Sequence, residues 1–185
     1  MPRCSVYALL TLLSFASTQI LAHDPDKLFP PDAVINVTLP PFNAKPNDGR
    51  DDTKAIQQAI TDHVDTGRTI YLPAGVYDIS DSLVWKNKQG LWRPHLTLQG
   101  QHREKTIIRL KDNTPSFWDQ EKLKAMIITG SFWQPGDPED GGGNKAFRNN
   151  LFDLTIHAGN LNARAIGVEW AVSNVGSLSR VSFRS

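Results

Sequence analysis

The amino-acid sequence predicts an all-β protein built as a solenoid, in which short strands wind into stacked coils and one amphipathic helix covers the first coil. Two features of the sequence lead to this prediction. A single segment with helical periodicity is followed by a long run of alternating and β-branched residues. Along that run, apolar-x-apolar pairs recur about every 26 to 30 residues, as expected where stacked repeats bury a common inner column.

The first 22 residues have the features of a secretory signal peptide. Arg3 supplies the basic start, an apolar stretch runs from Val6 to Phe15, and the small residue Ala22 precedes a polar segment. The apolar stretch is far shorter than the ~20 residues that cross a bilayer. A buried N-terminal helix, the other interpretation, fits the small-residue exit less well. We therefore expect a secreted, periplasmic or extracellular protein with no membrane segment after cleavage.

Charge and cysteine content narrow the function classes. The chain has 20 Lys plus Arg and 19 Asp plus Glu, so loss of Arg3 with the signal leaves the mature chain without net charge when His is neutral. Such a balance does not indicate nucleic acid as a partner. The same cleavage removes Cys4, the only cysteine. The mature chain therefore has to be stabilised by burial and not by disulfides.

After the signal, residues 23–33 form a proline-rich leader and residues 34–185 form one domain. Strand-like alternation from Ala33 to Leu39, flanked by prolines, predicts one edge strand. Within it, Asn36 begins an Asn-Val-Thr sequence, which is a glycosylation acceptor in hosts that glycosylate. Chance composition accounts for this tripeptide equally well.

The helix is predicted over residues 53–64, where four apolar residues recur with helical spacing: Ile56, Ala59, Ile60 and Val64. Asp51, Asp52 and Thr53 stand at its start, and their side-chain oxygens suit the free N–H groups of a first helical turn. Adjacent acids could instead bind a metal or share a proton. Because neighbouring side chains diverge, we assign them to capping and expect no metal site. Gly67 follows as the residue that ends the helix.

Five apolar-x-apolar pairs after the helix predict the rungs of the solenoid. They are Ile70/Leu72, Leu96/Leu98, Met126/Ile128, Leu154/Ile156 and Val181/Phe183. We expect each pair to lie directly above the previous one, although such pairs are common enough that spacing alone does not exclude an ordinary sheet. Because the last rung has no polar cap after it, we also expect an incomplete C-terminus and self-association through the open end of the solenoid.

The segments FNAKPNDGRDDTKAIQQAI, TIYLPAGVYDIS, LTLQG and TIIRL, in this order, resemble the opening of the pectate lyase superfamily domain of the rhamnogalacturonase and epimerase-like type. The shared features are a GAKGDG-like loop, in which Pro46 replaces a usual glycine, a helix started by Asp-Asp-Thr, and a PxGxY pair of strands. The resemblance runs from about Val34 to the end of the chain. It implies a right-handed parallel β-helix with the helix as N-terminal cap, and a polysaccharide groove on the outer face of later coils.

Candidate residues for chemistry are few. Hydrolysis of a glycosidic bond uses two carboxyl groups about 5 to 9.5 Å apart, whereas elimination from a uronate uses a cation and a base. Asp153 and Glu169 lie in predicted strands and are the candidate catalytic carboxylates, with Arg148, Arg164 and Arg180 nearby in sequence, although an ordinary solvated position suits each of them too. Trp118 and Trp133 are the candidate sugar-stacking residues, with packing under loops as the alternative.

Several site classes are absent from the sequence. The loop from Gly136 to Asn144 has acids and glycines that could surround Ca²⁺, but it lacks the spacing of a calcium-binding loop and reads as a flexible connection. No nucleophilic triad, phosphate-binding loop, dinucleotide motif or zinc spacing is present. We expect no cofactor, with Ca²⁺ needed only if the protein is a lyase.

Together these features predict a secreted carbohydrate-active protein. We expect a polysaccharide hydrolase or lyase that acts on pectin-like or β-glucan polymers, with most of its active site on coils beyond this chain. Two alternatives stay open: a non-catalytic β-helix that binds or adheres to polysaccharide, and an inactive fragment. Resemblance in fold does not choose among the three.

Overall fold

The computed structural model describes residues 25–118, 121–131 and 145–185. The predicted signal peptide, Trp133 and the loop from Gly136 to Asn144 lie outside these residues. In the described ranges the helices and strands are β1 Ile35–Asn36, α1 Thr53–His63, β2 Thr69–Leu72, β3 Gly75–Ile79, β4 Leu83–Val84, β5 Thr97–Gly100, β6 Thr106–Leu110, the 3-10 helix η1 Pro115–Phe117, β7 Lys124–Ile128, β8 Asn150–His157, β9 Ala165–Glu169 and β10 Ser177–Arg184.

In the described residues, the strands form two sheets, and neighbouring strands within each sheet are parallel. The larger sheet has the order β1-β2-β5-β8-β6-β3, with β10 beside β8, and the smaller has the order β4-β7-β9. β8 joins the two arms of the larger sheet, because residues 150–152 pair with β5 and residues 155–157 pair with β6. The larger sheet is therefore bent at β8.

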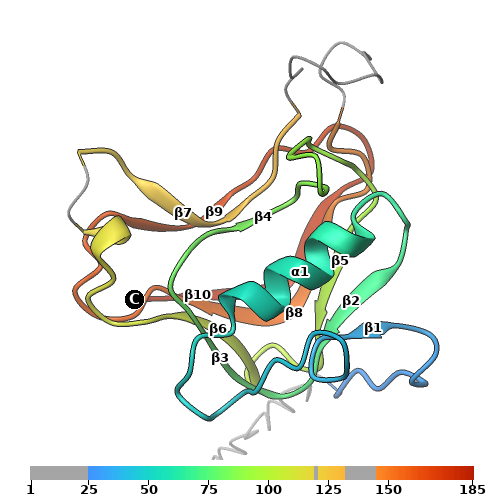
Figure 1. Cartoon of the computed structure of the whole chain (residues 1–185), viewed down its shortest axis with the longest axis horizontal. Helices are drawn as coiled ribbons and strands as arrows, with labels where there is room; N and C mark the ends of the chain where they lie inside the picture. The colour runs from blue at the N-terminus through green and yellow to red at the C-terminus, as the bar shows by residue number, and fades with distance from the viewer. Residues whose placement is uncertain (1–24, 119–120, 132–144) are drawn as a thin grey trace, which may run out of the picture.

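The bent larger sheet forms two faces of the molecule, and the smaller sheet forms a third. The first face consists of β1, β2, β5 and the first halves of β8 and β10; the second consists of β3, β6 and the second halves of β8 and β10; the third consists of β4, β7 and β9. Figure 1 shows these faces arranged around a common interior. The protein has an all-β, β-helix-like fold, and the predicted stacking of parallel coils is confirmed at this level.

Apolar side chains at matching positions of successive coils fill the interior. On the first face, Ile70, Leu98 and Leu151 lie in register and are fully buried. The corresponding buried residues are Tyr77, Ile108 and Ile156 on the second face and Leu83 and Ile127 on the third. Full burial of such a side chain contributes about 1.5–3 kcal/mol, so these stacks hold the coils together.

The prediction that the five apolar pairs form a single column is wrong. The Met126/Ile128 pair lies in β7 on the third face, and the Leu154/Ile156 pair lies in the half of β8 that runs beside β6. Only Leu154/Ile156 and Val181/Phe183 stack directly as predicted. The spacing misled because each coil has several strands with the same apolar alternation, so a constant interval along the chain does not select one face.

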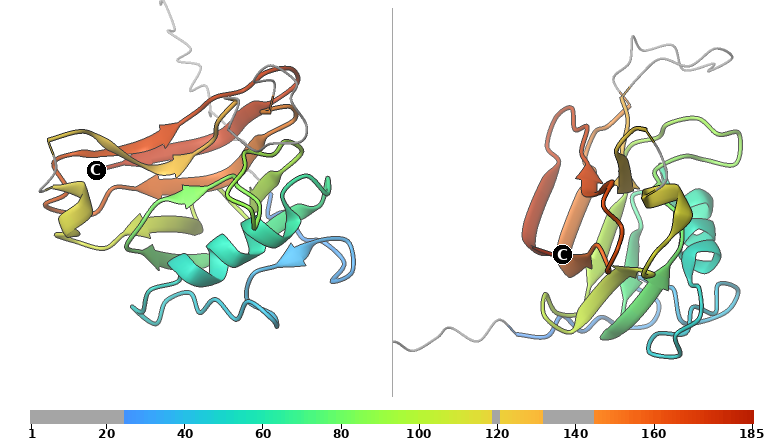
Figure 2. Two further views of the ribbon diagram at one scale, coloured as in Figure 1. Left: turned by 45° about the horizontal axis from the view of Figure 1, so that its top comes forward. Right: turned by 90° about the vertical axis from the view of Figure 1, so that its left-hand side faces the viewer.

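Helix α1 lies at the end of the stack opposite to β10 (Figure 2, right). Its apolar residues Ile56, Ala59 and Ile60 are fully buried and belong to the same core as the strands. The helix ends at His63, one residue earlier than expected. Among the described residues, the helices are too short or too polar to cross a membrane.

The start of α1 differs from the prediction at one residue. Asp51 accepts hydrogen bonds from the N–H (3.0 Å) and the hydroxyl (2.5 Å) of Thr53. Asp52 stands at the N-cap position, but its side chain makes no capping hydrogen bond. Its Oδ1 instead accepts a hydrogen bond from the N–H of Lys45 (2.7 Å), because the preceding loop folds back over it. Burial raises the pKa of Asp52 above its ordinary value.

Residues before the first complete coil meet its backbone edges on all three faces. β1 pairs with β2 on the first face, and the N–H of Asp52 donates to the carbonyl of Asp78 in β3 (2.7 Å) on the second. On the third face the side-chain amide of Gln57 takes the place of a strand. Its Nε2 donates to the carbonyl of Val84 (2.9 Å), and its Oε1 accepts from the N–H of Val84 (2.8 Å).

Candidate functional site

One backbone conformation recurs before each of four strands of the first face. The first residues of β2, β5, β8 and β10 lie in register: Thr69, Thr97, Asn150 and Ser177. The residue two positions earlier has a positive φ in each case, and we call these residues the pocket row: Gly67 (70°), His95 (60°), Arg148 (49°) and Val175 (57°). The turn into the first face is therefore built in the same way in successive coils.

Hydrogen bonds between coils hold the pocket row in this conformation. The N–H of Gly67 donates to the carbonyl of His95 (3.2 Å), and the N–H of His95 donates to the carbonyl of Phe147 (2.8 Å). The N–H of Arg148 donates to the carbonyl of Asn174 (3.1 Å). A left-handed conformation costs a non-glycine residue roughly 1–2 kcal/mol, and these bonds offset that strain. The side chains of His95 and Arg148 consequently leave their coils at equivalent places.

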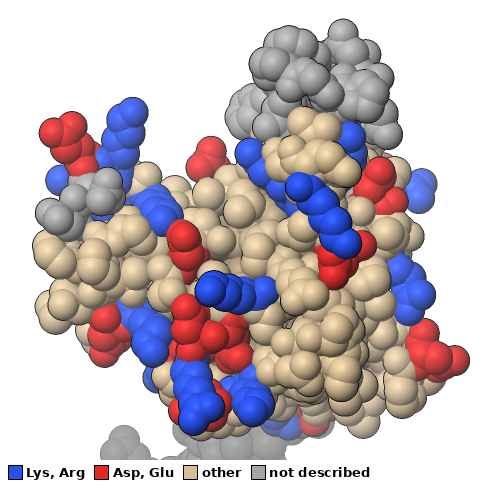
Figure 3. All heavy atoms as spheres, in the orientation of Figure 1, with Lys and Arg blue, Asp and Glu red and all other residues tan. Residues whose placement is uncertain are grey.

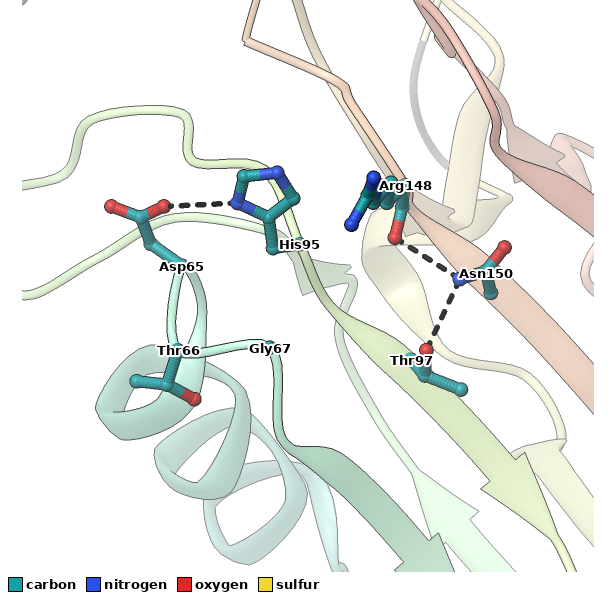
Figure 4. Close-up of a pocket in the computed structure, with 7 residues that line it drawn as sticks. All are labelled: Asp65, Thr66, Gly67, His95, Thr97, Arg148 and Asn150. Atoms are coloured by element: carbon teal, nitrogen blue, oxygen red, sulfur yellow. Dashed lines mark hydrogen bonds and ion pairs between the residues drawn. The ribbon is translucent and has the colours of Figure 1, made fainter.

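A pocket of about 390 Å³ lies beside this row. The residues that line it are Asp65, Thr66, Gly67, His95, Thr97, Arg148 and Asn150 (Figure 4). Gly67 contributes no side chain, and a Cβ added there would have no heavy atom within 4 Å. The space beside Gly67 is therefore open, and among the pocket row the side chains that border it are those of His95 and Arg148.

The polar groups of the pocket are oriented by their own contacts (Figure 4). Oδ1 of Asp65 lies 3.5 Å from Nδ1 of His95. The side-chain amide of Asn150 donates hydrogen bonds to the hydroxyl of Thr97 (3.2 Å) and to the carbonyl of Arg148 (3.1 Å). Because Arg148 is exposed, its guanidinium is accessible to a ligand from solvent.

This set of groups suits a ligand with hydroxyl groups and a negative charge. A guanidinium presents a planar fork of donors that matches a carboxylate, and the hydroxyl of Thr97 and the amide of Asn150 supply donors and acceptors. Asp65 is the one carboxylate among the described residues that line the pocket, whereas glycoside hydrolysis uses two. Within the described ranges, no group of three or more His, Cys, Asp or Glu is placed to hold a metal ion.

Asp153, the first candidate catalytic carboxylate, lies at the bend of β8 between the first and second faces. It has a positive φ (54°), as has Arg180 (51°) at the matching bend of β10, and we call these two residues the corner pair. Nε and Nη2 of Arg180 both donate hydrogen bonds to the carboxylate, the latter at 2.7 Å. Nε2 of Gln99 donates a third at 2.6 Å. The side chain of Asp153 is only 1% exposed.

These contacts decide the protonation of Asp153. Burial raises its pKa, but the hydrogen bonds from Arg180 and Gln99 outweigh burial and hold the pKa below its ordinary value. A general acid for glycoside hydrolysis needs the opposite shift. In this arrangement Asp153 is an ionised partner of Arg180 near neutral pH and does not have the properties of a proton donor.

Glu169, the second candidate carboxylate, is the last residue of β9 on the third face and is exposed. Asp153 belongs to the larger sheet and Glu169 to the smaller one. The structure does not bring them into one pocket, and neither lines the pocket beside the pocket row. A catalytic role for either residue stays a prediction.

The tryptophans divide between the surface and the core. Trp118 follows η1 and is 40% exposed, so part of its ring is accessible for sugar stacking. Trp133, the other candidate, lies outside the described residues. Trp85 and Trp92 are buried, which matches the alternative of packing for these two rings.

Asn36, the predicted glycosylation acceptor, lies in β1 and is partly buried. Its Oδ1 accepts hydrogen bonds from the N–H (2.9 Å) and the hydroxyl (2.8 Å) of Thr38. Modification of Asn36 therefore stays a prediction.

Sequence reasoning missed Asp65 and His95 as site residues, and it noted Arg148 only as an arginine near the candidate carboxylates in sequence. Their common signal is a position shortly before a strand of the first face, and it becomes visible only when the strand register is known. The residue types of the pocket row differ, and the segments between its members differ in length. Of the row, only Gly67 stood out in the sequence, as a residue tolerant of positive φ.

Charged side chains of both signs are interspersed over the face drawn in Figure 3. This agrees with the close balance of 20 Lys plus Arg and 19 Asp plus Glu in the sequence. A ligand that approaches this face is therefore selected by local side chains and not by a broad field of one sign.

Comparison with known proteins assigns the chain to a family. No curated protein and no solved structure matches the chain significantly. A family model described as rhamnogalacturonase A/epimerase, pectate lyase-like, matches residues 34–185, a range that contains every described strand and helix. The chain therefore belongs to the pectate lyase-like family of rhamnogalacturonase A and epimerases, a carbohydrate-active family whose substrates are polysaccharides.

Proposed function

We propose that this chain is secreted and binds an acidic, pectin-like polysaccharide at the pocket between Asp65, His95 and Arg148. The observation that carries the proposal is the recurrence of the pocket row, which places an exposed guanidinium beside open space and next to a line of polar side chains. The guanidinium and the polar side chains together match a sugar acid. The carboxylate of such a sugar needs paired donors, and its hydroxyls need both donors and acceptors.

Arg148 favours pectin-like polymers over β-glucans. A neutral glucan has no carboxylate, so it would leave the planar fork of Arg148 without its best partner. The line of Thr97, Asn150 and Ser177 runs along the stacking direction beside the pocket, with Oγ of Ser177 3.4 Å from Oδ1 of Asn150. This line offers hydroxyl and amide groups to successive sugar units of a bound chain.

Elimination at the same pocket is the second candidate function. His95 stands beside Asp65, and a carboxylate next to an imidazole orients it to accept a proton. In an elimination, a base removes the proton next to the sugar carboxylate, the electron pair forms a carbon–carbon double bond, and the glycosidic oxygen leaves. Arg148 would neutralise the carboxylate during this step. Hydrolysis has less support, because Asp153 is ionised and Glu169 lies on another sheet.

The test compares Arg148→Met with Arg50→Met, a matched control at an exposed arginine outside the pocket. Binding to pectin, rhamnogalacturonan and β-1,3-glucan is measured by titration calorimetry. We expect Arg148→Met to weaken pectin binding by about tenfold or more, since hydrogen bonds to charged groups contribute about 1.5–3 kcal/mol, and Arg50→Met to leave it unchanged. Equal affinities for the two variants, or equal binding of pectin and β-1,3-glucan, would contradict the proposal.

The products distinguish the candidate reactions. Elimination creates unsaturated ends that absorb ultraviolet light, hydrolysis creates reducing ends without that absorbance, and simple binding creates neither. We expect any ultraviolet signal from pectin to disappear in His95→Ala. A signal that survives in this variant would exclude His95 as the base.

We propose in addition that α1 is the N-terminal cap of the coils. Its apolar face lies in the core, and Gln57 supplies the two hydrogen bonds that β4 would otherwise exchange with a further strand. We expect Gln57→Ala to lower the free energy of unfolding by about 1–3 kcal/mol, because both backbone groups of Val84 lose their partners. The neighbouring exposed Gln58→Ala is the control. Equal unfolding midpoints of the two variants in urea would refute this role.

A further inference from the structure

Two residues on the outer side of the first face are buried although they point away from the core. In β2, Ile70 and Leu72 are fully buried inside, so Tyr71 between them points outward; in β5, Gln99 follows the inward Leu98 in the same way. Tyr71 and Gln99 are nevertheless only 6% exposed each. Outward residues of a sheet are normally accessible to solvent, so other groups cover these two. Gln99 lies against the corner pair, and its Nε2 donates hydrogen bonds to Asp153 (2.6 Å) and to the carbonyl of Gly100 (2.7 Å).

Tyr71 is covered by the leader, whose residues 25–33 we call the N-terminal strap. The hydroxyl of Tyr71 donates to the carbonyl of Lys27 (2.8 Å), and the N–H of Lys27 donates to the carbonyl of Gln101 (2.6 Å). The ring of Phe29 meets Tyr71 edge-on at a centroid distance of 5.2 Å. In Figure 2 (right) this segment, in blue, runs along the outside of the stack.

The strap is held weakly compared with what it covers. Eight of its nine residues are exposed, and Lys27 is half-buried. The ion pair between Asp26 and Lys105 (2.8 Å) joins two side chains that are 33% and 47% exposed, and surface pairs of this kind stabilise little. Segments with few buried contacts open locally without global unfolding. The strap can therefore leave Tyr71 while the coils stay intact.

The outward residues in register with Tyr71 lie next to the proposed saccharide site. Gln99 lies two residues after Thr97 on β5, and Phe152 lies two residues after Asn150 on β8, so each pair projects from the same side of its strand. Tyr71, Gln99 and Phe152 lie in register. They form a second line parallel to the polar line, about 7 Å away at two residues of extended chain.

We propose that Tyr71 and Phe152, on either side of Gln99, form a second polysaccharide-binding platform, in which the N-terminal strap covers Tyr71 and a long polymer uncovers this ring by displacing the strap. An aromatic ring offers a flat apolar surface with a polar rim, which suits the CH faces of a sugar ring. The proposal rests on the proposed function, because it extends the saccharide path from the pocket across the first face. A closed strap leaves room for short saccharides at the pocket alone.

The experiment loosens the strap in the full chain. Asp26→Ala with Phe29→Ala removes the ion pair and the ring contact, and Tyr71→Phe removes the hydroxyl donated to Lys27 while it keeps the ring. Hydrogen exchange at the N–H of Lys27 reports opening, and the unfolding midpoint reports folding. We expect faster exchange at Lys27 and at least fivefold tighter binding of long pectin in both variants. In Asp26→Ala with Phe29→Ala, whose residues lie outside the platform, we expect unchanged binding of a short pectin oligomer.

A third variant identifies the platform. Adding Tyr71→Ala to the loosened chain should abolish the gain, because the ring that stacks on sugar is lost. Unchanged affinity for long pectin in chains whose Lys27 N–H exchanges faster would overturn the proposal, and so would a gain that survives Tyr71→Ala. If binding persists and depends on Arg148 but ignores the strap, this inference alone fails. If no chain binds pectin, the proposed function fails with it.

Discussion

The pocket row and the corner pair have the same left-handed backbone in opposite surroundings. At the start of the first face, His95 and Arg148 point to solvent beside open space. At its end, Asp153 is buried and bound by Arg180 through two hydrogen bonds. The backbone decides where a side chain leaves the coil, and the neighbouring coil decides whether that side chain is available to a ligand or used to hold the coils together.

The sharpest test of this contrast places the same substitution at both ends of the face. A Cβ on Gly100 would lie 2.2 Å from the carbonyl oxygen of Asp153, whereas a Cβ on Gly67 would meet nothing within 4 Å. We expect Gly100→Ala to lower the free energy of unfolding by about 3 kcal/mol or more through overpacking. For Gly67→Ala we expect about 1 kcal/mol, from its φ of 70° alone. Urea denaturation measures both, and similar losses would remove the contrast.

The corner pair should give the next largest effect. Arg180→Gln leaves a buried carboxylate without its cation, which would cost about 3–5 kcal/mol in a fully buried pair. Because the side chain of Arg180 is 42% exposed, water screens part of this, and we expect about 1–2 kcal/mol. Asp153→Asn is the partner variant for a double-mutant cycle in urea. A coupling free energy near zero would show that the pair does not hold the coils.

The same pair has a defined pH dependence. The folded pKa of Asp153 is below its ordinary value, so its ionisation stabilises the fold above the unfolded pKa of about 3.9. This contribution is lost as pH falls through the folded pKa. We expect the difference in unfolding free energy between the parent chain and Asp153→Asn to be full at pH 7 and to shrink below about pH 4. A difference independent of pH would assign the effect to packing.

The smallest effect on stability is expected at the pocket row. His95→Ala and Arg148→Ala remove exposed or half-exposed side chains and keep a residue with Cβ at the same φ, so each should change the free energy of unfolding by no more than about 0.5 kcal/mol. Thermal unfolding measures this. Destabilisation above about 1 kcal/mol by either variant would mean that the row supports the fold and is not reserved for a ligand.

The helix and the first strands were predictable from sequence because local rules determine them. Apolar residues spaced for a helix and the alternation around Ile70 act within a few residues. The assignment of strands to faces was not predictable, because it depends on the lengths of connections between coils. Asp153 was identified as a candidate and Arg180 was noted nearby in sequence. Their pairing was not predicted, although the two residues occupy the same place in two Leu-x-x-apolar-x-apolar segments 27 residues apart.

The pocket itself could not be predicted from the sequence. Asp65, His95 and Arg148 come from three different connections, and their convergence depends on the register of β2, β5 and β8. Asp52 shows that sequence reasoning can fail at short range too. Its side chain accepts a hydrogen bond from the N–H of Lys45 and not from an N–H of the helix. Local preference named the residue types correctly there, but the competing loop determined which N–H was satisfied.

The repeated turn before the first face places one outward side chain per coil at a regular spacing along the molecule. Neighbouring parallel strands lie about 4.8 Å apart. Equivalent outward residues of successive coils are therefore separated by this distance, while the backbone conformation around them stays the same. Glycine, histidine, arginine and valine all occupy that position here. A protein engineer could therefore substitute these side chains one coil at a time to change which linear polymer the protein binds, without redesigning the scaffold.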